Sequence, residues 1–384
     1  MQYLDFIITH YGWQGIALAI TLFVLFGIQV YYHGIAYARI ATYRNDRRPR
    51  CIDSDQPAIS VVVTLYSENS HYLESGLLQL LAQEYSAYEI VVVYVGSDND
   101  FYEDLSRMKL YYPNLRTTKI EVSRFPISPK MAINVGIKAA QNEHIILTTP
   151  DATPNSTRWL TLMAKGFTRG EIVLGYCGYE RCDMTGNYLM RTERLTSSME
   201  WIAAAIKQRP YRGNHNNIGF TKSLYFSVNG FGNLNMNTGE DDLFMQQIMT
   251  RNNVSIVLSP RASVSERCWG GLRWWFSQSR YYGSTHKLYP TEARTFGHWE
   301  RGSRLLFFLA TATALAVMPF EYKIAAATLL LVRFILVMVT TSRICKRLGE
   351  RGIIGHYPLY DLFAPLLSLF LGALRLRKDP AVWR

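Results

Sequence analysis

A long stretch without charged side chains lies near the start of the chain and limits what the chain can fold into. No Asp, Glu, Lys or Arg occurs between Asp5 and Arg39. Residues 13–32 (WQGIALAITLFVLFGIQVYY) are mostly apolar, and about 20 such residues span a membrane at a rise of about 1.5 Å per residue. A cleaved signal peptide is the alternative, but no Lys or Arg precedes the run and no small-residue cleavage site follows it. The stretch therefore predicts a transmembrane anchor in residues 1–40.

The segment that follows this anchor is strongly basic. Residues 39–50 contain five Arg against one Asp. An excess of Lys and Arg marks the cytoplasmic flank of a transmembrane helix. We therefore expect the N-terminus outside, residues 41–56 as a juxtamembrane linker, and the chain up to about residue 303 in the cytoplasm. This is the orientation of a multi-pass protein of the inner (plasma) membrane.

Two more apolar runs, residues 305–320 and 324–340, follow in the last quarter of the chain. A short polar turn separates them, and the basic residues 343–351 come after the second run. By the same charge rule, we expect a transmembrane hairpin in residues 301–342 that returns to the cytoplasm.

A fourth apolar segment, residues 356–374, contains two Pro and Asp361 between basic flanks. This pattern favours an interfacial or re-entrant helix within residues 343–384. Arg333 lies inside the third apolar run, where a charge needs a partner. Three partners are open: a lipid phosphate, Asp361, or the membrane interface reached by snorkelling.

The composition agrees with a membrane protein. Of 384 residues, 18% are charged and 48% are hydrophobic, and the formal net charge is +11. These values exclude a disordered or acidic chain. The positive charge gathers at the membrane flanks, where anionic lipid headgroups attract it, which argues against a nucleic-acid partner. The five cysteines lack CxxC spacing, so we interpret them as reduced thiols and not as a zinc site.

Between the anchor and the hairpin, the sequence alternates between strand and helix patterns. Apolar β-branched stretches alternate with amphipathic ones, which is typical of a mostly parallel α/β sheet with helices on both faces. We predict strands at 58–66, 88–95, 120–122 and 144–148, and helices at about 73–83 and 130–140. Ligands of such sheets bind beyond the carboxyl ends of the strands, which points to residues 66–68, 95–98 and 149–151.

Three acidic residues in a row, Glu240, Asp241 and Asp242, stand at the start of a helical pattern. Helix capping and the helix dipole explain one or two of them, so a capping role for Asp241 stays open. Farther on, residues 269–282 interleave Trp and Tyr with Arg. Such a segment suits a nucleic-acid face, a membrane-interface platform or a surface that stacks on carbohydrate, and the adjacent membrane segments favour the last two.

Six stretches in this order resemble the family 2 glycosyltransferases, in particular their membrane-anchored branch. The resemblance covers about residues 57–290. The stretches are PAISVVVTLYSEN, YEIVVVYVGSDND, SPKMAINVGIKAAQNEHIILTTPDATP, GFTKSLYFSVNGF, GEDDLF and RWWFSQSR. They match the first strand and its turn, the second strand and its turn, the lysine helix with the DXD strand, the acceptor-side segment, the ED motif and the QxxRW helix.

The resemblance implies a GT-A (Rossmann-like) domain in residues 57–300 that transfers a sugar with inversion. Such enzymes bind a nucleotide-diphosphate sugar with Mg²⁺ or Mn²⁺, and a carboxylate deprotonates the acceptor hydroxyl. It implies that Asp241 is the base with Glu240 and Asp242 beside it, and that Asp151 is the metal ligand unless it is a plain turn residue. The donor-binding residues implied are Tyr66, Glu68, Asp98, Lys130, Asp151, Gln278 and Arg280. The acceptor-side residues implied are Asn216, Trp274 and Trp275.

The sequence departs from the family pattern at four positions. Val95 stands where the family carries a nucleotide-binding Asp, and Thr149 replaces the first Asp of the DXD motif. Asn216 falls where anchored relatives carry Arg, and Tyr281 falls on the Arg position of QxxRW. A Val cannot accept a hydrogen bond, and the loss of an Asp removes a charge from a metal site.

Two functions are compatible with these patterns. The first is an inverting transferase that moves a sugar from a nucleotide-sugar donor to a membrane-associated acceptor, namely a lipid-linked glycan, a lipopolysaccharide or a polysaccharide. In that case Asp98 or Asp100 takes over donor binding, and the few apolar segments favour a non-processive enzyme. The second is a catalytically impaired scaffold for a glycan-assembly partner. Membrane lipids are expected partners in both cases.

Overall fold

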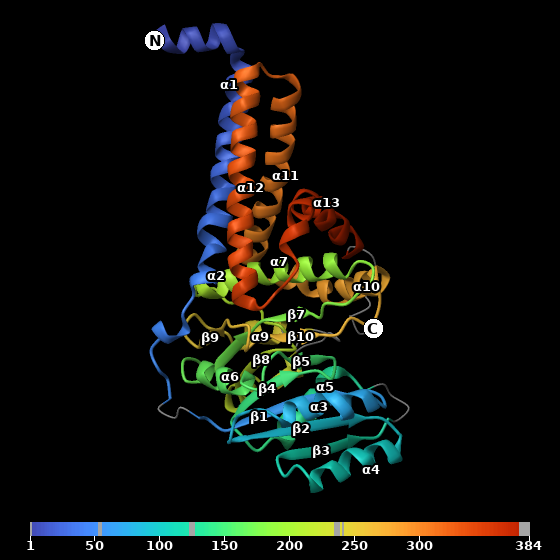
Figure 1. Ribbon diagram of the computed structural model, residues 1–384. Helices are drawn as coiled ribbons and strands as arrows, with labels where there is room; N and C mark the ends of the chain where they lie inside the picture. Colours follow the sequence, from blue (N-terminus) through green and yellow to red (C-terminus); the bar gives the residue numbers. More distant parts are fainter. Residues whose placement is uncertain (1, 53–55, 123–126, 234–238, 240–241, 376–384) are drawn as a thin grey trace.

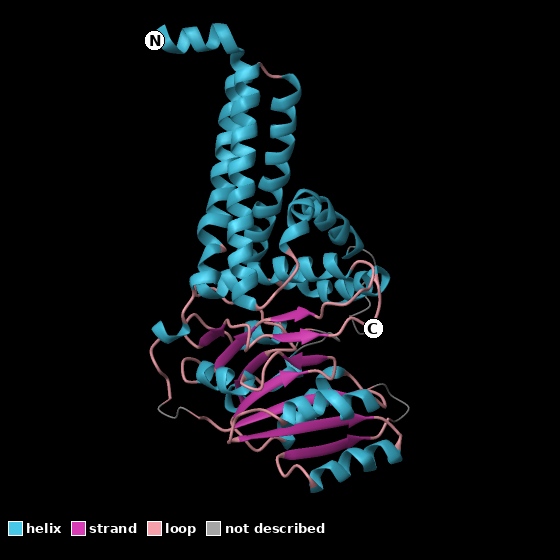
Figure 2. Ribbon diagram, viewed as in Figure 1, coloured by secondary structure: helices cyan, strands magenta, loops and turns pink. Residues whose placement is uncertain are grey.

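The computed structural model describes residues 2–52, 56–122, 127–233, 239 and 242–375. An α/β body carries the described strands, and a tall helical bundle stands on one side of it (Figures 1 and 2). The strands are β1 (Ile59–Leu65), β2 (Tyr88–Val95), β3 (Leu115–Ile120), β4 (His144–Thr148), β5 (Ala152–Pro154), β6 (Ile172–Gly175), β7 (Cys177–Tyr179), β8 (Ile218–Thr221), β9 (Val254–Val257) and β10 (Val264–Glu266). The α-helices are α1 (Gln2–Val30), α2 (Ala38–Thr42), α3 (Leu77–Leu81), α4 (Asn99–Arg107), α5 (Pro129–Ala139), α6 (Trp159–Phe167), α7 (Asn187–Ile206), α8 (Lys222–Ser227), α9 (Leu243–Ile248), α10 (Leu272–Gly283), α11 (Thr291–Val317), α12 (Phe320–Leu348) and α13 (Tyr357–Arg375).

The main sheet has seven strands in the order β3-β2-β1-β4-β8-β6-β9. β1 to β4 run parallel, and β8 runs antiparallel to its neighbours β4 and β6. In the middle of the sheet, Ile59 of β1 pairs with Tyr88 of β2 and with His144 of β4. β1 is buried along its whole length, as expected for a parallel strand covered on both faces. The mostly parallel α/β fold predicted from the sequence is confirmed.

The third strand differs from its prediction. The sequence pattern predicts it at residues 120–122, whereas β3 covers Leu115–Ile120. β3 lies at the edge of the sheet, and Leu115 is its one fully buried residue. Because an edge strand is partly exposed, it lacks the continuous apolar run on which the prediction relied.

Helix α5 packs very closely on this sheet. Ser128 caps its first turn by accepting a hydrogen bond from a backbone N–H, and Pro129 occupies the first helical position. A Cβ atom at Gly136 would overlap the side chain of Val62 in β1, so this approach requires glycine. Since α5 leads into the start of β4, its first turn, with Lys130, lies toward the carboxyl ends of the strands.

A second sheet, in the order β5-β10-β7, lies beside the main sheet (Figure 1). β10 pairs antiparallel with β5 and parallel with β7. The long helix α7 contacts β7 and also the helices α2, α11 and α13. Helix α7 is therefore the layer that joins the α/β body to the helical bundle.

The helical bundle consists of α1, α11 and α12, which stand side by side (Figure 1). Among the described residues, two helical stretches are long and apolar enough to cross a membrane: Gly12–Thr42, of 31 residues, and Phe320–Leu348, of 29 residues. The first joins α1 to α2 through a π-helical turn at Tyr31–Ala36. Helix α11 is charged in its amino-terminal half and apolar in its carboxyl-terminal half.

A buried group of charges holds α13 against the bundle. Arg333 of α12 is 0% exposed, and its Nη2 lies 3.2 Å from Oδ1 of Asp361 in α13. The same Oδ1 lies 3.1 Å from Nη1 of Arg304 in α11. Arg333 also donates to Gln29 at 2.9 Å, and Arg304 pairs with Glu300 at 2.7 Å. The sequence left three possible partners for Arg333, and in the structure Arg333 pairs with one of them, Asp361.

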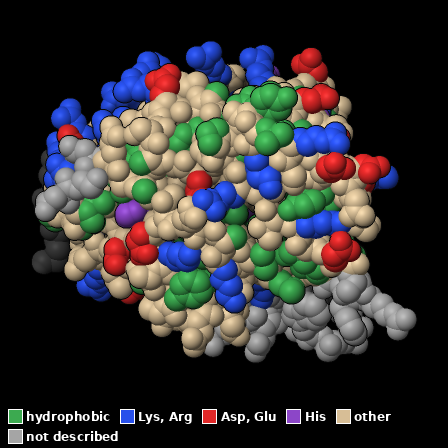
Figure 3. Space-filling model, turned by 90° about the horizontal axis from the view of Figure 1, so that it is seen from below, with side chains coloured by type: hydrophobic (Ala, Val, Ile, Leu, Met, Phe, Trp, Pro, Cys, Tyr) green, Lys and Arg blue, Asp and Glu red, His purple; other side chains and the backbone are tan. Residues whose placement is uncertain are grey.

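The end of the α/β body opposite the bundle carries charges of both signs. In Figure 3, which views this end, Lys and Arg are interspersed with Asp and Glu, and hydrophobic side chains are scattered among them. On α4, for example, Arg107 pairs with Glu103 at 2.9 Å and with Asp104 at 3.3 Å. Such exposed pairs contribute little to stability.

Candidate functional site

Five of the seven expected donor-binding residues lie at one edge of the main sheet, whereas Gln278 and Arg280 lie on α10. β1, β2 and β4 are parallel neighbours, so their carboxyl ends face the same way (Figure 1). Tyr66 and Glu68 follow β1, Asp98 follows β2, and Asp151 follows β4. Tyr66 and Glu68 are exposed at this edge, and Lys130 in the first turn of α5 is 7% exposed. This is the edge at which α/β sheets bind ligands.

Tyr94, which the sequence analysis did not single out, joins two of these residues. Its hydroxyl donates to Oε1 of Glu68 at 2.9 Å and accepts from the backbone N–H of Asp98 at 3.3 Å. Burial, together with the Glu68 carboxylate, raises the pKa of Tyr94 to about 12, so its hydroxyl stays protonated. A Cβ atom at Gly96 would overlap the Tyr94 phenol, which explains the glycine in this turn. The one sequence signal for Tyr94 as a site residue is its position near the carboxyl end of β2, after a run of valines.

Asp98 has a structural role in this turn. Its side chain caps α4 by accepting from the backbone N–H of Phe101 at 3.0 Å. Val95, which the sequence analysis expects at a nucleotide-binding position, is the last residue of β2 and is 5% exposed. The prediction that Asp98 or Asp100 replaces the missing carboxylate in donor binding is not tested by these contacts.

Two of the departures from the family pattern contact each other. The Thr149 hydroxyl donates to Oδ1 of Asn216 at 2.9 Å, and Asn216 is 0% exposed. The Asn216 amide also lies 3.8 Å from the Cys177 sulfur. Two neutral side chains therefore hydrogen-bond to each other where β4 ends.

Asp151 is the carboxylate closest in sequence to this pair. It is half-buried, and burial raises its pKa above the usual value while a hydrogen bond with Trp269 opposes that shift. Its backbone carbonyl accepts from the N–H of Arg267 at 2.8 Å, and the Arg267 guanidinium lies 4.6 Å from the centre of the Trp269 ring. Among the residues the structure describes, no three His, Cys, Asp or Glu side chains gather into a metal cage.

Of the carboxylate cluster, Glu240 and Asp241 lie outside the described residues, and Asp242 is within them. Asp242 is 2% exposed and caps α9, its Oδ1 accepting from the N–H of Leu243 at 2.6 Å. Its Oδ2 accepts from the hydroxyls of Thr285 and of Tyr289, the latter at 2.7 Å. Arg212 Nη1 lies 3.2 Å from the Tyr289 hydroxyl. The sequence analysis did not identify Thr285 and Tyr289, because they lie 43 and 47 residues after Asp242 and share no short motif with it.

Two of the four expected residues of α10 lie at a cavity, and Trp274 and Arg280 do not line it. A cavity of about 850 Å³ lies between α7, α10, α11 and α13, and Gln278 and Trp275 line it. Trp275 is 1% exposed and packs in a cluster with Met190, Cys268 and Leu371, so most of its ring is not available for stacking on a sugar. Trp274 is partly buried and meets the Tyr179 ring edge-on at 6.2 Å between centroids.

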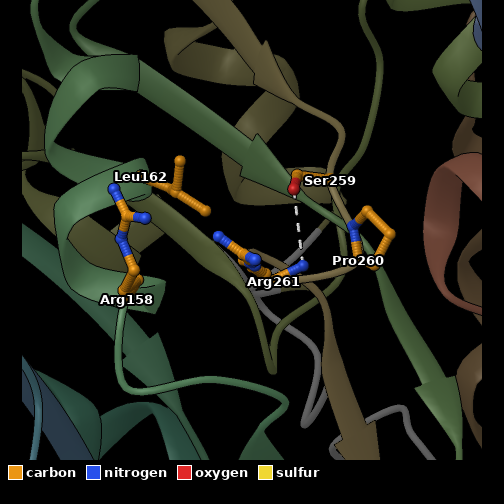
Figure 4. A pocket seen from close by; sticks show the side chains of 5 residues that line it. All are labelled: Arg158, Leu162, Ser259, Pro260 and Arg261. Atoms are coloured by element: carbon orange, nitrogen blue, oxygen red, sulfur yellow. Dashed lines mark hydrogen bonds between the residues drawn. The ribbon is translucent and has the colours of Figure 1, made fainter.

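The cavity reaches the carboxylate segment, because Tyr289 and Arg212 also line it. A smaller pocket of about 320 Å³ lies elsewhere, between the start of α6 and the segment after β9 (Figure 4). It is lined by Arg158, Leu162, Ser259, Pro260 and Arg261. None of these residues was expected at the site, whereas Trp275 and Gln278 line the larger cavity.

Comparison with known proteins bears on the fold and on the family of the α/β body. Residues 60–230 match the family described as Glycosyl transferase family 2. An uncharacterized glycosyltransferase of Haemophilus influenzae is 24% identical over 145 residues, which are 35% of this chain and 52% of that protein. The chain thus spans about half the length of this curated relative.

One solved structure shows a similar fold over most of its length. The mannosyltransferase PcManGT of Pyrobaculum calidifontis, in complex with GDP-Man and Mn²⁺, superposes with a TM-score of 0.52 at 18% identity, over 91% of this chain and 99% of that one. S. aureus TarS 1-349, in complex with UDP-GlcNAc, superposes with a TM-score of 0.40 at 14% identity, over 82% and 92%. The first similarity supports the predicted α/β glycosyltransferase-like fold.

Proposed function

We propose that this protein is an inverting glycosyltransferase that moves a sugar from a nucleotide-diphosphate donor to a membrane-associated acceptor. The family 2 domain in residues 60–230 carries the proposal. The carboxyl ends of β1, β2 and β4 supply the donor side, and the cavity beside Asp242 supplies room for the acceptor.

In the proposed step, the acceptor hydroxyl oxygen attacks the anomeric carbon of the donor. The bond from this carbon to the diphosphate breaks, the hydroxyl proton passes to the Asp241 carboxylate, and the nucleoside diphosphate leaves. Glu240 is its neighbour in this role. Asp242 acts as a positioning residue instead, because its oxygens accept from Leu243, Thr285 and Tyr289.

The residues present fit a divalent ion that is held mainly by the donor. Asp151 is a single carboxylate, and Mg²⁺ or Mn²⁺ is commonly bound by one or two carboxylates together with substrate phosphates. When bound, such an ion offsets the negative charge on the leaving diphosphate. Because PcManGT is described with GDP-Man and Mn²⁺, these are the first compounds to test here.

We place the protein in the inner membrane with the α/β body in the cytoplasm. Gly12–Thr42 and Phe320–Leu348 are the proposed spans, together with the apolar half of α11. Helix α13 is proposed to lie at the interface, because a row of its apolar side chains is more than two-fifths exposed. These are Leu359, Leu362, Phe363, Leu366, Leu369 and Phe370.

A catalytically impaired scaffold is the second candidate function. The observation that favours it is the neutral pair of Thr149 and Asn216, together with Val95 at the end of β2. These side chains offer no charge to a donor or a metal. A scaffold of this kind would serve a partner in glycan assembly.

The experiment that separates the two measures binding of GDP and UDP to the purified full chain, with and without Mn²⁺. The transferase is expected to bind one nucleotide in a Mn²⁺-dependent manner, and Asp151→Ala should weaken that binding. Asp104→Ala, which changes an exposed carboxylate of α4, is the matched control. Absence of nucleotide binding at millimolar concentration would leave the scaffold as the function.

Asp241→Asn tests the proposed base. Because the base acts on the acceptor, this variant should lose sugar transfer while nucleotide binding stays close to that of the unmodified protein. Sugar transfer at an unchanged rate in this variant would remove Asp241 from the mechanism.

A further inference from the structure

An exposed arginine, Arg267, lies beside the carboxylate of Asp151. Strand β10 pairs antiparallel with β5, and Glu266 at its end lies opposite Ala152. The next residue, Arg267, therefore lies opposite Asp151, and its backbone N–H donates to the Asp151 carbonyl at 2.8 Å. Because Asp151 follows β4, this contact places Arg267 at the carboxyl edge of the main sheet, which is the edge at which α/β sheets bind ligands.

The Arg267 guanidinium stacks on an aromatic ring. It lies 4.6 Å from the centre of the Trp269 ring, and cation–π contacts extend to about 6 Å. Trp269 is 52% exposed, and its side chain donates a hydrogen bond to the Asp151 carboxylate. The same indole ring thus contacts the carboxylate and the guanidinium, which limits the positions that the guanidinium can take beside Asp151.

No ion pair neutralises the charge of Arg267 within the part of the chain that the structure describes. Its neighbour Glu266 pairs with Arg194 instead, at 3.0 Å. Burial raises the pKa of Asp151, and the Trp269 hydrogen bond and the charge of Arg267 oppose that shift, so the guanidinium acts on this carboxylate through space. Arg267 is therefore an exposed cation that is close to Asp151 and accessible to an anion entering at this edge.

The two side chains attract ligands of opposite charge. The Asp151 carboxylate attracts a cation, and the Arg267 guanidinium attracts an anion. A guanidinium also presents a planar fork of N–H donors that matches two oxygens of a phosphate. A diphosphate with a bound divalent ion carries both charges, whereas an uncharged sugar carries neither. The pair of side chains therefore fits the metal–diphosphate part of a nucleotide-sugar better than its sugar.

We propose that Arg267 binds the diphosphate of the donor and that Trp269 is the positioning residue that holds Arg267 beside Asp151. The sugar donor in this statement rests on the proposed function, whereas the binding of a diphosphate does not. Arg267 exchanges no proton in this role, because a guanidinium stays charged in proteins. It binds phosphate oxygens by charge-assisted hydrogen bonds alone.

The probes are inorganic pyrophosphate, GDP and UDP, titrated into the full chain in detergent and followed by calorimetry, once with Mn²⁺ and once with EDTA. Arg267→Gln should weaken pyrophosphate binding, and binding of whichever nucleotide binds, at least about tenfold, because hydrogen bonds to a charged group are lost. Arg267→Lys keeps the charge without the planar fork, so its affinity should lie between the two. Arg261→Gln is the matched control, because Arg261 is also exposed and lies in the turn after β9, at the smaller pocket.

Two substitutions separate the ring of Trp269 from its indole N–H. Trp269→Ala should weaken pyrophosphate binding in EDTA several-fold, because Arg267 loses the ring on which it stacks. Trp269→Phe keeps a ring, so it should retain most of the binding in EDTA and lose part of the Mn²⁺-dependent binding, because Asp151 loses the indole donor. Trp299→Ala, at a position of α11 that is 65% exposed, is the matched control.

Near-UV circular dichroism of each variant reports whether the fold is retained. A folded Arg267→Gln variant that binds pyrophosphate and the nucleotide as tightly as the unmodified protein would overturn the proposal. Equal losses of binding in EDTA for Trp269→Ala and Trp269→Phe would overturn the positioning role of the ring.

Failure of this proposal and failure of the proposed function give different results. If GDP and UDP do not bind but pyrophosphate binds and Arg267→Gln removes that binding, the transferase function fails and the diphosphate site stands. If a nucleotide binds with Mn²⁺ and sugar is transferred equally well by folded Arg267→Gln, the role of Arg267 fails and the transferase function stands.

Discussion

A single substitution at the buried carboxylate of Asp242 tests the proposed role of this residue in positioning the segment that contains the proposed base. Asp242→Ala removes a carboxylate that is 2% exposed and leaves the hydroxyls of Thr285 and Tyr289 without their acceptor. It also removes the cap of α9. The expected results are a lower unfolding temperature and a loss of sugar transfer through misplacement of residues 239–241.

The size of the effect follows from these contacts. Hydrogen bonds to a charged group contribute about 1.5–3 kcal/mol each, and loss of a helix cap costs about 1 kcal/mol. The lower values give about 4 kcal/mol in total. For a domain of about 150–250 residues, each kcal/mol shifts the unfolding temperature by about 2–4 °C. We therefore expect Asp242→Ala to unfold about 8–16 °C below the unmodified protein.

The assay is thermal unfolding of the full chain in detergent, followed by near-UV circular dichroism. Asp104→Ala is the control, because exposed ion pairs contribute about 0–1 kcal/mol. In the double variant Asp242→Ala with Tyr289→Phe, the two losses should be less than additive, since they remove the same hydrogen bond. An Asp242→Ala protein that unfolds within about 2 °C of the control would refute the assigned role of Asp242.

Two further predictions concern other buried or half-buried carboxylates. Asp361→Ala leaves Arg333 and Arg304 buried without this carboxylate, and it should lower the stability of the full chain in detergent by about 3–5 kcal/mol. In the same thermal assay, the double variant Asp361→Leu with Arg333→Met should recover most of that loss, because it removes both charges of the buried pair. Burial raises the pKa of Asp151, so this carboxylate takes up a proton at a higher pH than an ordinary Asp with a pKa of about 3.9. As the pH is lowered, Mn²⁺-dependent nucleotide binding should therefore begin to weaken at a higher pH than it would with an ordinary Asp at this position. Titration calorimetry measures this binding constant, and a constant that stays unchanged down to pH 4 would contradict the prediction.

Much of the fold could be predicted from the sequence because it depends on local patterns. The continuous apolar runs of β1, β2 and β4 mark buried parallel strands, and the edge strand β3 was misplaced because its residues are partly exposed. The candidate site was predicted only in its outline. Tyr94, Thr285 and Tyr289 were missed, since each acts through a contact that no short motif records.

The sequence by itself predicted the order of a long apolar helix, an α/β body and two further apolar runs, because hydrophobicity and charge along the chain decide which segments can enter a sheet or an apolar environment. It also placed the donor-side residues at the strand ends, since parallel strands share one carboxyl edge. The tertiary structure alone decided that Thr149 meets Asn216, that Arg333 meets Asp361, and that a cavity between α7, α10, α11 and α13 reaches Tyr289, the hydrogen-bond partner of Asp242. These features join residues from different elements, and their contacts arise only when the helices pack on the sheet.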